Sequence, residues 1–193
     1  MRKINVSSLS ILAFAAAVNV TGGSIALFFR LPVYLDTVGT MLAAALLGPV
    51  YGMVPGLISG LVSGFTSDIY ALYYIPVQLI TGAMAGLLFK KFDMKGFCII
   101  LAAACISLPG TVVSAAITAA VFGGITSSGS TVLVQLLHGA GLNMTASVCA
   151  VQALTDYADR AVVLLLVIMI LAALPSSMKF MIRKGNTGHG ALQ

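Results

Sequence analysis

The sequence predicts an all-α membrane protein, a bundle of six transmembrane helices with the N- and C-termini in the cytoplasm. Of the 193 residues, 60% are hydrophobic and only 8% are charged, whereas ordinary soluble domains carry roughly 25% charged residues. The apolar runs are long, while a transmembrane barrel requires ~10-residue segments of alternating polarity. The 20 glycines fit closely packed membrane helices, because small residues allow neighbouring backbones to approach each other.

Six apolar segments are candidates for membrane-spanning helices, each of which ordinarily needs ~20 apolar residues. They cover residues 9–29, 37–48, 51–66, 72–89, 96–122 and 156–178. The first follows a basic start, MRK, like that of a signal peptide, but it is longer than the usual ~7–15-residue signal core, so we expect it to be retained. Gly48 and Pro49 signal a turn between the second and third segments. Because both segments are short, we expect tilted, broken or partly re-entrant helices covered by protein.

The helices are expected to form one domain, residues 1–178, followed by a basic and mobile cytoplasmic tail, residues 179–193. The stretch LPVYLDTVGT follows the first helix, and Pro32 in it favours an extended backbone at Leu31. The Gly- and Ser-rich stretch before the sixth helix is expected to form a long extracytoplasmic loop, with a short helix near residues 131–138.

The distribution of Lys and Arg predicts the orientation, because cytoplasmic loops carry an excess of these residues. With six helices and a cytoplasmic N-terminus, eight of the ten basic residues fall on the cytoplasmic side. These are Arg2, Lys3, Lys90, Lys91, Lys95, Lys179, Arg183 and Lys184. Of the five acidic residues, only Asp93 falls inside. Topology therefore explains the net charge of +5, and we do not expect a nucleic-acid partner.

Unusual side chains gather at the outer end of the predicted bundle, where they are candidates for substrate binding. Ionisable groups at membrane depth are costly and often mark a functional site, and aromatic residues with a few convergent polar groups are typical of a small-molecule pocket. The candidate substrate-binding residues are Arg30, Tyr34, Asp36, Asp68, Tyr70, Tyr74, Gln78, His138, Asn143, Asp156 and Arg160.

Many of these residues also have a purely structural interpretation. Tyrosines at a membrane interface form the ordinary aromatic belt. Asp36 could cap the second helix, and His138 could be a solvated loop residue. Asp156 and Asp159 stand at the start of the predicted sixth helix, where the helix dipole favours negative charge, and Arg160 could pair with Asp156 at i, i+4. The argument for a site is collective, since these residues come from four separate loops at one face.

Motifs of catalysis are absent from the sequence. It contains no Walker A loop, HExxH or GxSxG, so we do not expect an enzyme, and we expect no cofactor or metal in this chain. The chain has no glutamate, and no acid is expected near the centre of a span, which weakens the case for an ion-coupled transporter. In the first helix Ala13 and Ala17 form an AxxxA pattern, which favours close approach of another helix, either within the bundle or from a partner.

Taken together, these segments resemble a known family. The AxxxA of the first helix, LPVYLDTVGT, LLGPVYGMVPGLISGLVSGF and DYADR are similar to the substrate-binding S components of energy-coupling factor (ECF) transporters, which are bacterial vitamin importers. The resemblance covers residues 9–178. It implies a multi-pass protein of the bacterial cytoplasmic membrane that binds a vitamin or related micronutrient in a pocket at the outer side.

The resemblance also implies partners. Ala13 and Ala17 would dock on the transmembrane T component, and two cytoplasmic ATPases would supply the energy. The substrate does not follow from it. The tyrosines of the outer loops suggest a ring-containing ligand, and Asp36, Asp68 and Asp156 could accept hydrogen bonds from its amine or hydroxyl groups.

Two other functions fit the same features. The chain could be a membrane sensor or receptor module that binds a ligand and signals to a partner, or it could be a secondary transporter that works alone.

Overall fold

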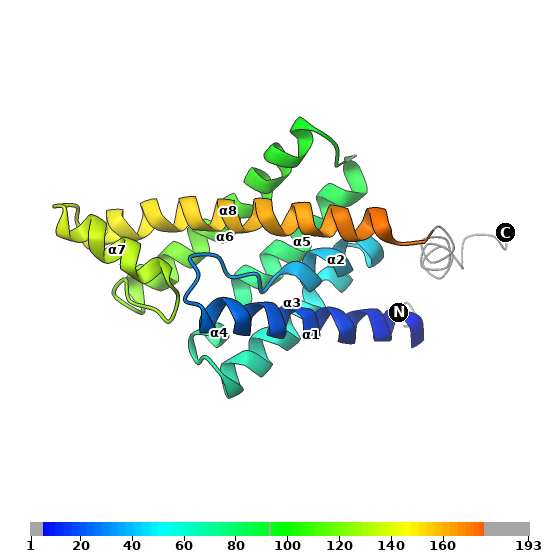
Figure 1. Ribbon diagram of the computed structural model, residues 1–193, viewed down its shortest axis with the longest axis horizontal. Coiled ribbons are helices and arrows are strands. Elements are labelled where there is room, and N and C mark those ends of the chain that lie inside the picture. The colour runs from blue at the N-terminus through cyan, green and yellow to red at the C-terminus, as the bar shows by residue number, and fades with distance from the viewer. Residues whose placement is uncertain (1–5, 93, 176–193) are drawn as a thin grey trace.

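The computed structural model describes residues 6–92 and 94–175, and this part of the chain is all-helical. The helices are α1 (Val6–Phe28), α2 (Val38–Leu47), α3 (Pro49–Thr66), α4 (Tyr70–Tyr73), α5 (Ile75–Lys91), α6 (Phe97–Ala120), α7 (Ser130–Gly139) and α8 (Met144–Ala173). The start of α1 and the end of α8 lie at the same end of the molecule, and α7 lies at the opposite end (Figure 1). We call this opposite end the α7 end.

Most of the predicted helices form close to their expected positions, including the short helix near residues 131–138, which is α7. A single turn, α4, precedes α5. The predicted tail, residues 179–193, and the last residues of the predicted domain lie outside the described residues.

The prediction for the last helix is wrong at its start. We expected it to begin at Asp156, but α8 begins at Met144, where the side chain of Asn143 accepts a hydrogen bond from the backbone N–H of Ala146. Its first turns are only intermittently apolar, which is why the pattern predicted a loop. They form a helix because they pack on α6 and α7. Asp156 therefore lies ~18 Å along the helix from its first residue, near the middle of α8.

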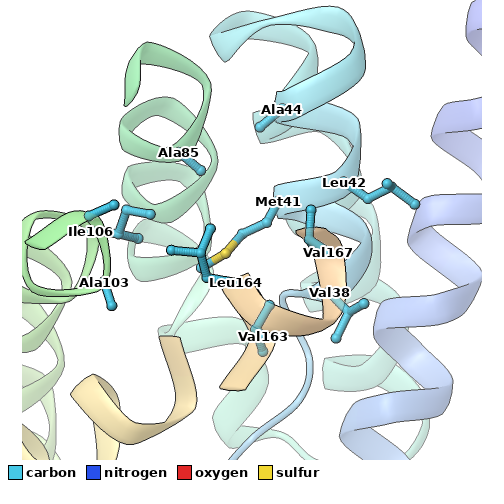
Figure 2. Close-up of a cluster of buried hydrophobic side chains, with 11 residues drawn as sticks. Val38, Met41, Leu42, Ala44, Ala85, Ala103, Ile106, Val163, Leu164 and Val167 are labelled. Atoms are coloured by element: carbon cyan, nitrogen blue, oxygen red, sulfur yellow. The ribbon is translucent and has the colours of Figure 1, made fainter. Parts of the chain in front are cut away.

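The short helix α2 forms the centre of the bundle. It contacts α1, α3, α5 and α8, and eight of its ten residues are buried. Figure 2 shows Met41 of α2 pointing towards Leu164 of α8, with Ala85 of α5 and Ile106 of α6 beside them. A helix too short to span a bilayer is thus enclosed by protein, which satisfies the condition for a short segment at membrane depth.

Glycines allow the central helices to approach closely. A Cβ atom added to Gly39 of α2 would lie 1.9 Å from the carbonyl oxygen of Ala15 in α1. One added to Gly82 of α5 would lie 2.6 Å from the carbonyl oxygen of Gly52 in α3. Both contacts are with backbone atoms, so only a residue without a side chain fits.

The surface of the bundle is strongly apolar. Within the described residues, α1 and α6 are long and apolar enough to cross a membrane. Large side chains on three helices face outward: Phe14 is 64% exposed, Leu108 is 64% exposed and Met169 is 67% exposed. Exposed apolar surface on this scale is unusual for a soluble monomer, and it indicates association with a membrane.

Candidate functional site

A cavity of about 110 Å³ lies where α1, α3, α4, α5, α6 and α8 converge with two loops. One loop joins α1 to α2 (residues 29–37, the 29–37 loop) and the other joins α6 to α7 (residues 121–129, the 121–129 loop). Eight of the predicted substrate-binding residues line this cavity. They are Tyr34, Asp36, Asp68, Tyr70, Tyr74, Gln78, Asp156 and Arg160.

The backbone of the 29–37 loop is attached to the middle of α8. Asp159 is completely buried, and its Oδ1 atom accepts hydrogen bonds from the backbone N–H groups of Tyr34 and Leu35, each at 2.9 Å. Leu35 has a positive φ of 52°, an uncommon conformation for a residue with a side chain. The two hydrogen bonds to one carboxylate explain how the loop retains this turn.

A buried ion pair adjoins this attachment. The guanidinium of Arg160 pairs with the carboxylate of Asp159 and also donates a hydrogen bond to the hydroxyl of Thr37 at 3.2 Å. The expected i, i+4 pair of Arg160 with Asp156 does not form. Because Asp159 also receives the N–H groups of the 29–37 loop, it is the carboxylate that fixes the guanidinium next to the start of α2.

Asp36 is directed to α5 and not to the helix that follows it. Its Oδ2 atom accepts a hydrogen bond from Nε2 of Gln78 at 2.6 Å, and α2 has no side-chain cap at its start. Of the two interpretations of Asp36, the cap of the second helix is therefore excluded. Burial raises the pKa of Asp36 to about 6, and the nearby negative charge of Asp159 adds to this rise.

Gln78 carries an unused hydrogen-bonding atom. The residue is only 6% exposed and lines the cavity, yet its Oε1 atom has no hydrogen-bond partner. A buried acceptor without a partner costs free energy; this oxygen is enclosed beside Gly56 of α3, so the part of Gln78 that serves the site is the Nε2 group that holds Asp36.

Asp156 also lines the cavity and bonds to α6. Its Oδ2 atom accepts a hydrogen bond from the hydroxyl of Ser114 at 2.7 Å. Near it, the hydroxyls of Tyr74 and Thr118 are 2.5 Å apart, and Nε2 of Gln152 donates to the same Thr118 oxygen at 2.8 Å. The helix-start explanation of Asp156 and Asp159 fails, because both residues lie near the middle of α8.

An aromatic wall borders the cavity on the side of α4. Phe122 lies at the centre of this wall, with ring centroids 4.7 Å from Tyr70, 5.0 Å from Tyr73 and 6.3 Å from Tyr74. Burial raises the pKa of Tyr74 to about 12, although its hydrogen bond with Thr118 opposes the rise. Tyr70 and Tyr74 line the cavity, a position that the aromatic-belt interpretation alone does not explain.

Tyr34 belongs to the 29–37 loop and also lines the cavity. Its hydroxyl is 3.5 Å from that of Ser130, at the start of α7. Burial holds the pKa of Tyr34 above its ordinary value, and the negative charge of Asp156 contributes. The same carboxylate acts on Tyr74, so two tyrosines lie within the electrostatic reach of Asp156.

Asp68 connects two segments at the mouth of the site. Its Oδ2 atom accepts a hydrogen bond from the hydroxyl of Ser127 at 2.5 Å, and its Oδ1 atom accepts one from the backbone N–H of Tyr70 at 3.2 Å. The turn between α3 and α4 is thereby attached to the 121–129 loop.

Three predicted site residues do not line the cavity. Arg30 is exposed and borders a separate hollow next to the 121–129 loop. His138 lies on α7, exposed, with its Nδ1 atom 2.8 Å from the carbonyl oxygen of Leu142. Asn143 caps the start of α8. His138 is exposed, as the solvated-residue interpretation expects, but it lies on a helix and not in a loop; the capping role of Asn143 was not predicted from the sequence.

Sequence reasoning missed several polar residues of the site. Asn19 is fully buried in α1 and lines the cavity. Its Nδ2 atom donates to the hydroxyl of Thr40 at 2.7 Å, and its Oδ1 atom accepts from the backbone N–H of Gly39 at 2.7 Å. Ser114 and Thr118 lie four residues apart on α6. The available signal was a single amide, or a pair of hydroxyls at helical spacing, within an otherwise apolar helix.

The described residues contain no group of three or more His, Cys, Asp or Glu side chains that could hold a metal ion. No family model matches this chain, and no curated protein or solved structure is similar to it. The chemistry of the cavity is therefore the main guide to function: carboxylates, an amide and aromatic rings that can bind a small polar molecule.

Proposed function

We propose that this chain is the substrate-binding S component of an ECF importer in a bacterial cytoplasmic membrane. It captures a vitamin or related micronutrient in the cavity, and a T component with two cytoplasmic ATPases completes the transporter. The α7 end faces outward, and six helical segments, α1, α2, α3, α5, α6 and α8, cross or enter the bilayer. The sequence resemblance is one source of this proposal, and the cavity is the other.

The observation that carries the proposal is a polar cavity inside an apolar bundle. Placing ionisable groups at membrane depth is costly. The cluster of Asp36, Asp156 and Arg160 around the cavity therefore favours a functional role over a purely structural one. A volume of about 110 Å³ is suited to a small molecule or to one ring of a larger one, since a cavity of ~150 Å³ is enough for benzene.

The exposed face of α1 supports a docking partner. Ala13 and Ala17, which we call the alanine pair, are both exposed, whereas Ala15 and Ala16 are buried. The opposite face of α1 packs on α2 and α3. The alanine pair is therefore not needed for packing inside the bundle, and it remains available to a helix of the T component.

Ligand binding by the purified chain tests the proposal. We expect the protein in nanodiscs to retain a micronutrient without ATP, detected as added mass by native mass spectrometry. The Asp36→Asn and Tyr74→Phe variants should retain less, because they alter two groups of the cavity wall, whereas His138→Gln, outside the cavity, should bind as the wild type does. Equal binding in all four proteins would remove Asp36 and Tyr74 from the site.

A second candidate function is favoured by the position of α8. We expected no acid near a span centre, but Asp156 and Asp159 lie near the middle of this helix, where acids of ion-coupled transporters are found. Uptake into liposomes that contain only this chain, driven by a pH or sodium gradient, would support a secondary transporter. Uptake that requires the T component and the ATPases supports the S component.

A further inference from the structure

We propose that the bound molecule is a small organic cation, with a positively charged nitrogen between Asp36 and Asp156 and a ring against the aromatic wall. This inference rests on the proposed function and specifies its substrate class. It is drawn from the charges, the unused hydrogen-bonding capacity and the size of the cavity.

The charges around the cavity do not balance. Three carboxylates line the cavity, those of Asp36, Asp68 and Asp156, together with one guanidinium, that of Arg160. Asp159 forms the ion pair with this guanidinium. Within the part of the chain that the structure describes, no other basic side chain forms an ion pair with the remaining three carboxylates. The charge of Arg160 also attracts Asp156 and Asp36, so one positive charge serves three carboxylates. Burying ionised carboxylates with incomplete compensation is costly, and a bound cation would supply further positive charge.

The free hydrogen-bonding atoms of the cavity are mainly acceptors. The Asp36 carboxylate receives a side-chain hydrogen bond from Gln78, and that of Asp156 receives one from Ser114. A carboxylate can accept about four hydrogen bonds, so both retain capacity. A ligand that donates hydrogen bonds, as a protonated nitrogen does, matches this wall, whereas an anion would face repulsion.

The size and the aromatic surface narrow the class further. A cavity of about 110 Å³ encloses roughly one ring, by comparison with the ~150 Å³ that admits benzene. Tyr70 and Tyr74 border it from the aromatic wall and Tyr34 from the 29–37 loop. Tyrosine rings attract cations through their faces and stack on planar rings. Large macrocyclic ligands and carboxylate-bearing vitamins do not fit this description.

The test uses the polar extract of yeast cells, separated by cation exchange at pH 7 into a cationic fraction and a flow-through fraction. The wild-type protein in nanodiscs is incubated with each fraction, washed and denatured, and the released compounds are identified by mass spectrometry. We expect retained compounds to come from the cationic fraction and to carry a net positive charge. Retention of neutral, zwitterionic or anionic compounds instead would overturn the cation class while leaving the proposed S-component function intact.

Variants sharpen the result. Asp36→Asn and Asp156→Asn each remove one negative charge from the cavity and should weaken retention about tenfold or more, because hydrogen bonds to charged groups are the strong ones. His138→Gln alters a residue that does not line the cavity and should have no effect. Undiminished retention by folded Asp156→Asn would contradict the proposal. If a variant does not fold, the net charge of the compounds that the wild-type protein retains still decides whether the ligand is a cation. If the wild-type protein retains no compound from either fraction, the proposed function itself is refuted.

Discussion

Replacing Asp159 by Asn should destabilise the fold strongly, because it removes the negative charge of a buried ion pair and leaves the positive charge of Arg160 without its partner. The amide can still accept the N–H groups of Tyr34 and Leu35, so the attachment of the 29–37 loop is largely kept. The guanidinium of Arg160, in contrast, loses the partner with which it forms its ion pair. Removing one partner of a buried pair costs ~3–5 kcal/mol. We expect the lower end of this range, since Asp36 also acts electrostatically on Arg160.

The measurement is equilibrium unfolding in mixed micelles of increasing SDS content, followed by circular dichroism at the helix band, because the chain has no tryptophan. The double variant Asp159→Asn with Arg160→Met is the control. Replacing both partners is often nearly neutral, so the double variant should recover most of the loss. Single-variant losses that simply add in the double variant, or an Asp159→Asn protein as stable as the wild type, would refute the reasoning.

Three further outcomes follow from the structure. Gly39→Ala should lower the free energy of unfolding by ~1–3 kcal/mol or more through overpacking, because the new methyl group meets the backbone of Ala15. The control is Gly139→Ala, which has open space around it and should be neutral or stabilising in the same SDS titration. Asp36 binds its proton more tightly in the folded state, since its pKa rises from 3.8 to about 6. Stability should therefore fall as the pH rises from about 4 to 6, by at most ~3 kcal/mol, and Asp36→Asn should flatten this dependence in unfolding measured across pH. Changing the alanine pair to Leu should abolish uptake by the assembled transporter but preserve ligand binding by the isolated chain, and unaffected uptake would contradict the docking assignment.

Helices with uninterrupted apolar runs were predicted correctly from the sequence. The start of α8 was missed, because polar residues interrupt its apolar run. The first turns of α8 contain Ser147 and Gln152, which are buried although their chemistry is typical of a loop. Ser147 donates to the carbonyl oxygen of Asn143 at 3.0 Å, and Gln152 donates to Thr118 of α6. The first of these contacts is local, at the helix start, but the second is a tertiary contact with α6 that local periodicity cannot reveal.

The residue types in the sequence predicted which side chains belong to the site, but they did not predict which of these side chains bond to each other. The scarcity of acids in an apolar chain singled out Asp36 and Asp156, and both line the cavity. Local spacing predicted a pair between Asp156 and Arg160, but the partner of the guanidinium depends on where the 29–37 loop folds back. Asp159 bonds to Tyr34 across 125 positions of sequence, a contact that no local pattern encodes.

The charged middle of α8 also has a consequence for biogenesis. On insertion scales, each charged residue at the centre of a helix opposes entry into the bilayer by ~2.5–3.5 kcal/mol, and α8 carries Asp156, Asp159 and Arg160 there. Asp159 bonds to the backbone N–H of Tyr34, and Arg160 bonds to the hydroxyl of Thr37. Both partners belong to the 29–37 loop, which is synthesised before α8. In the proposed topology, α8 should therefore insert stably only after α1 and the 29–37 loop, which precede it in the chain, are in place.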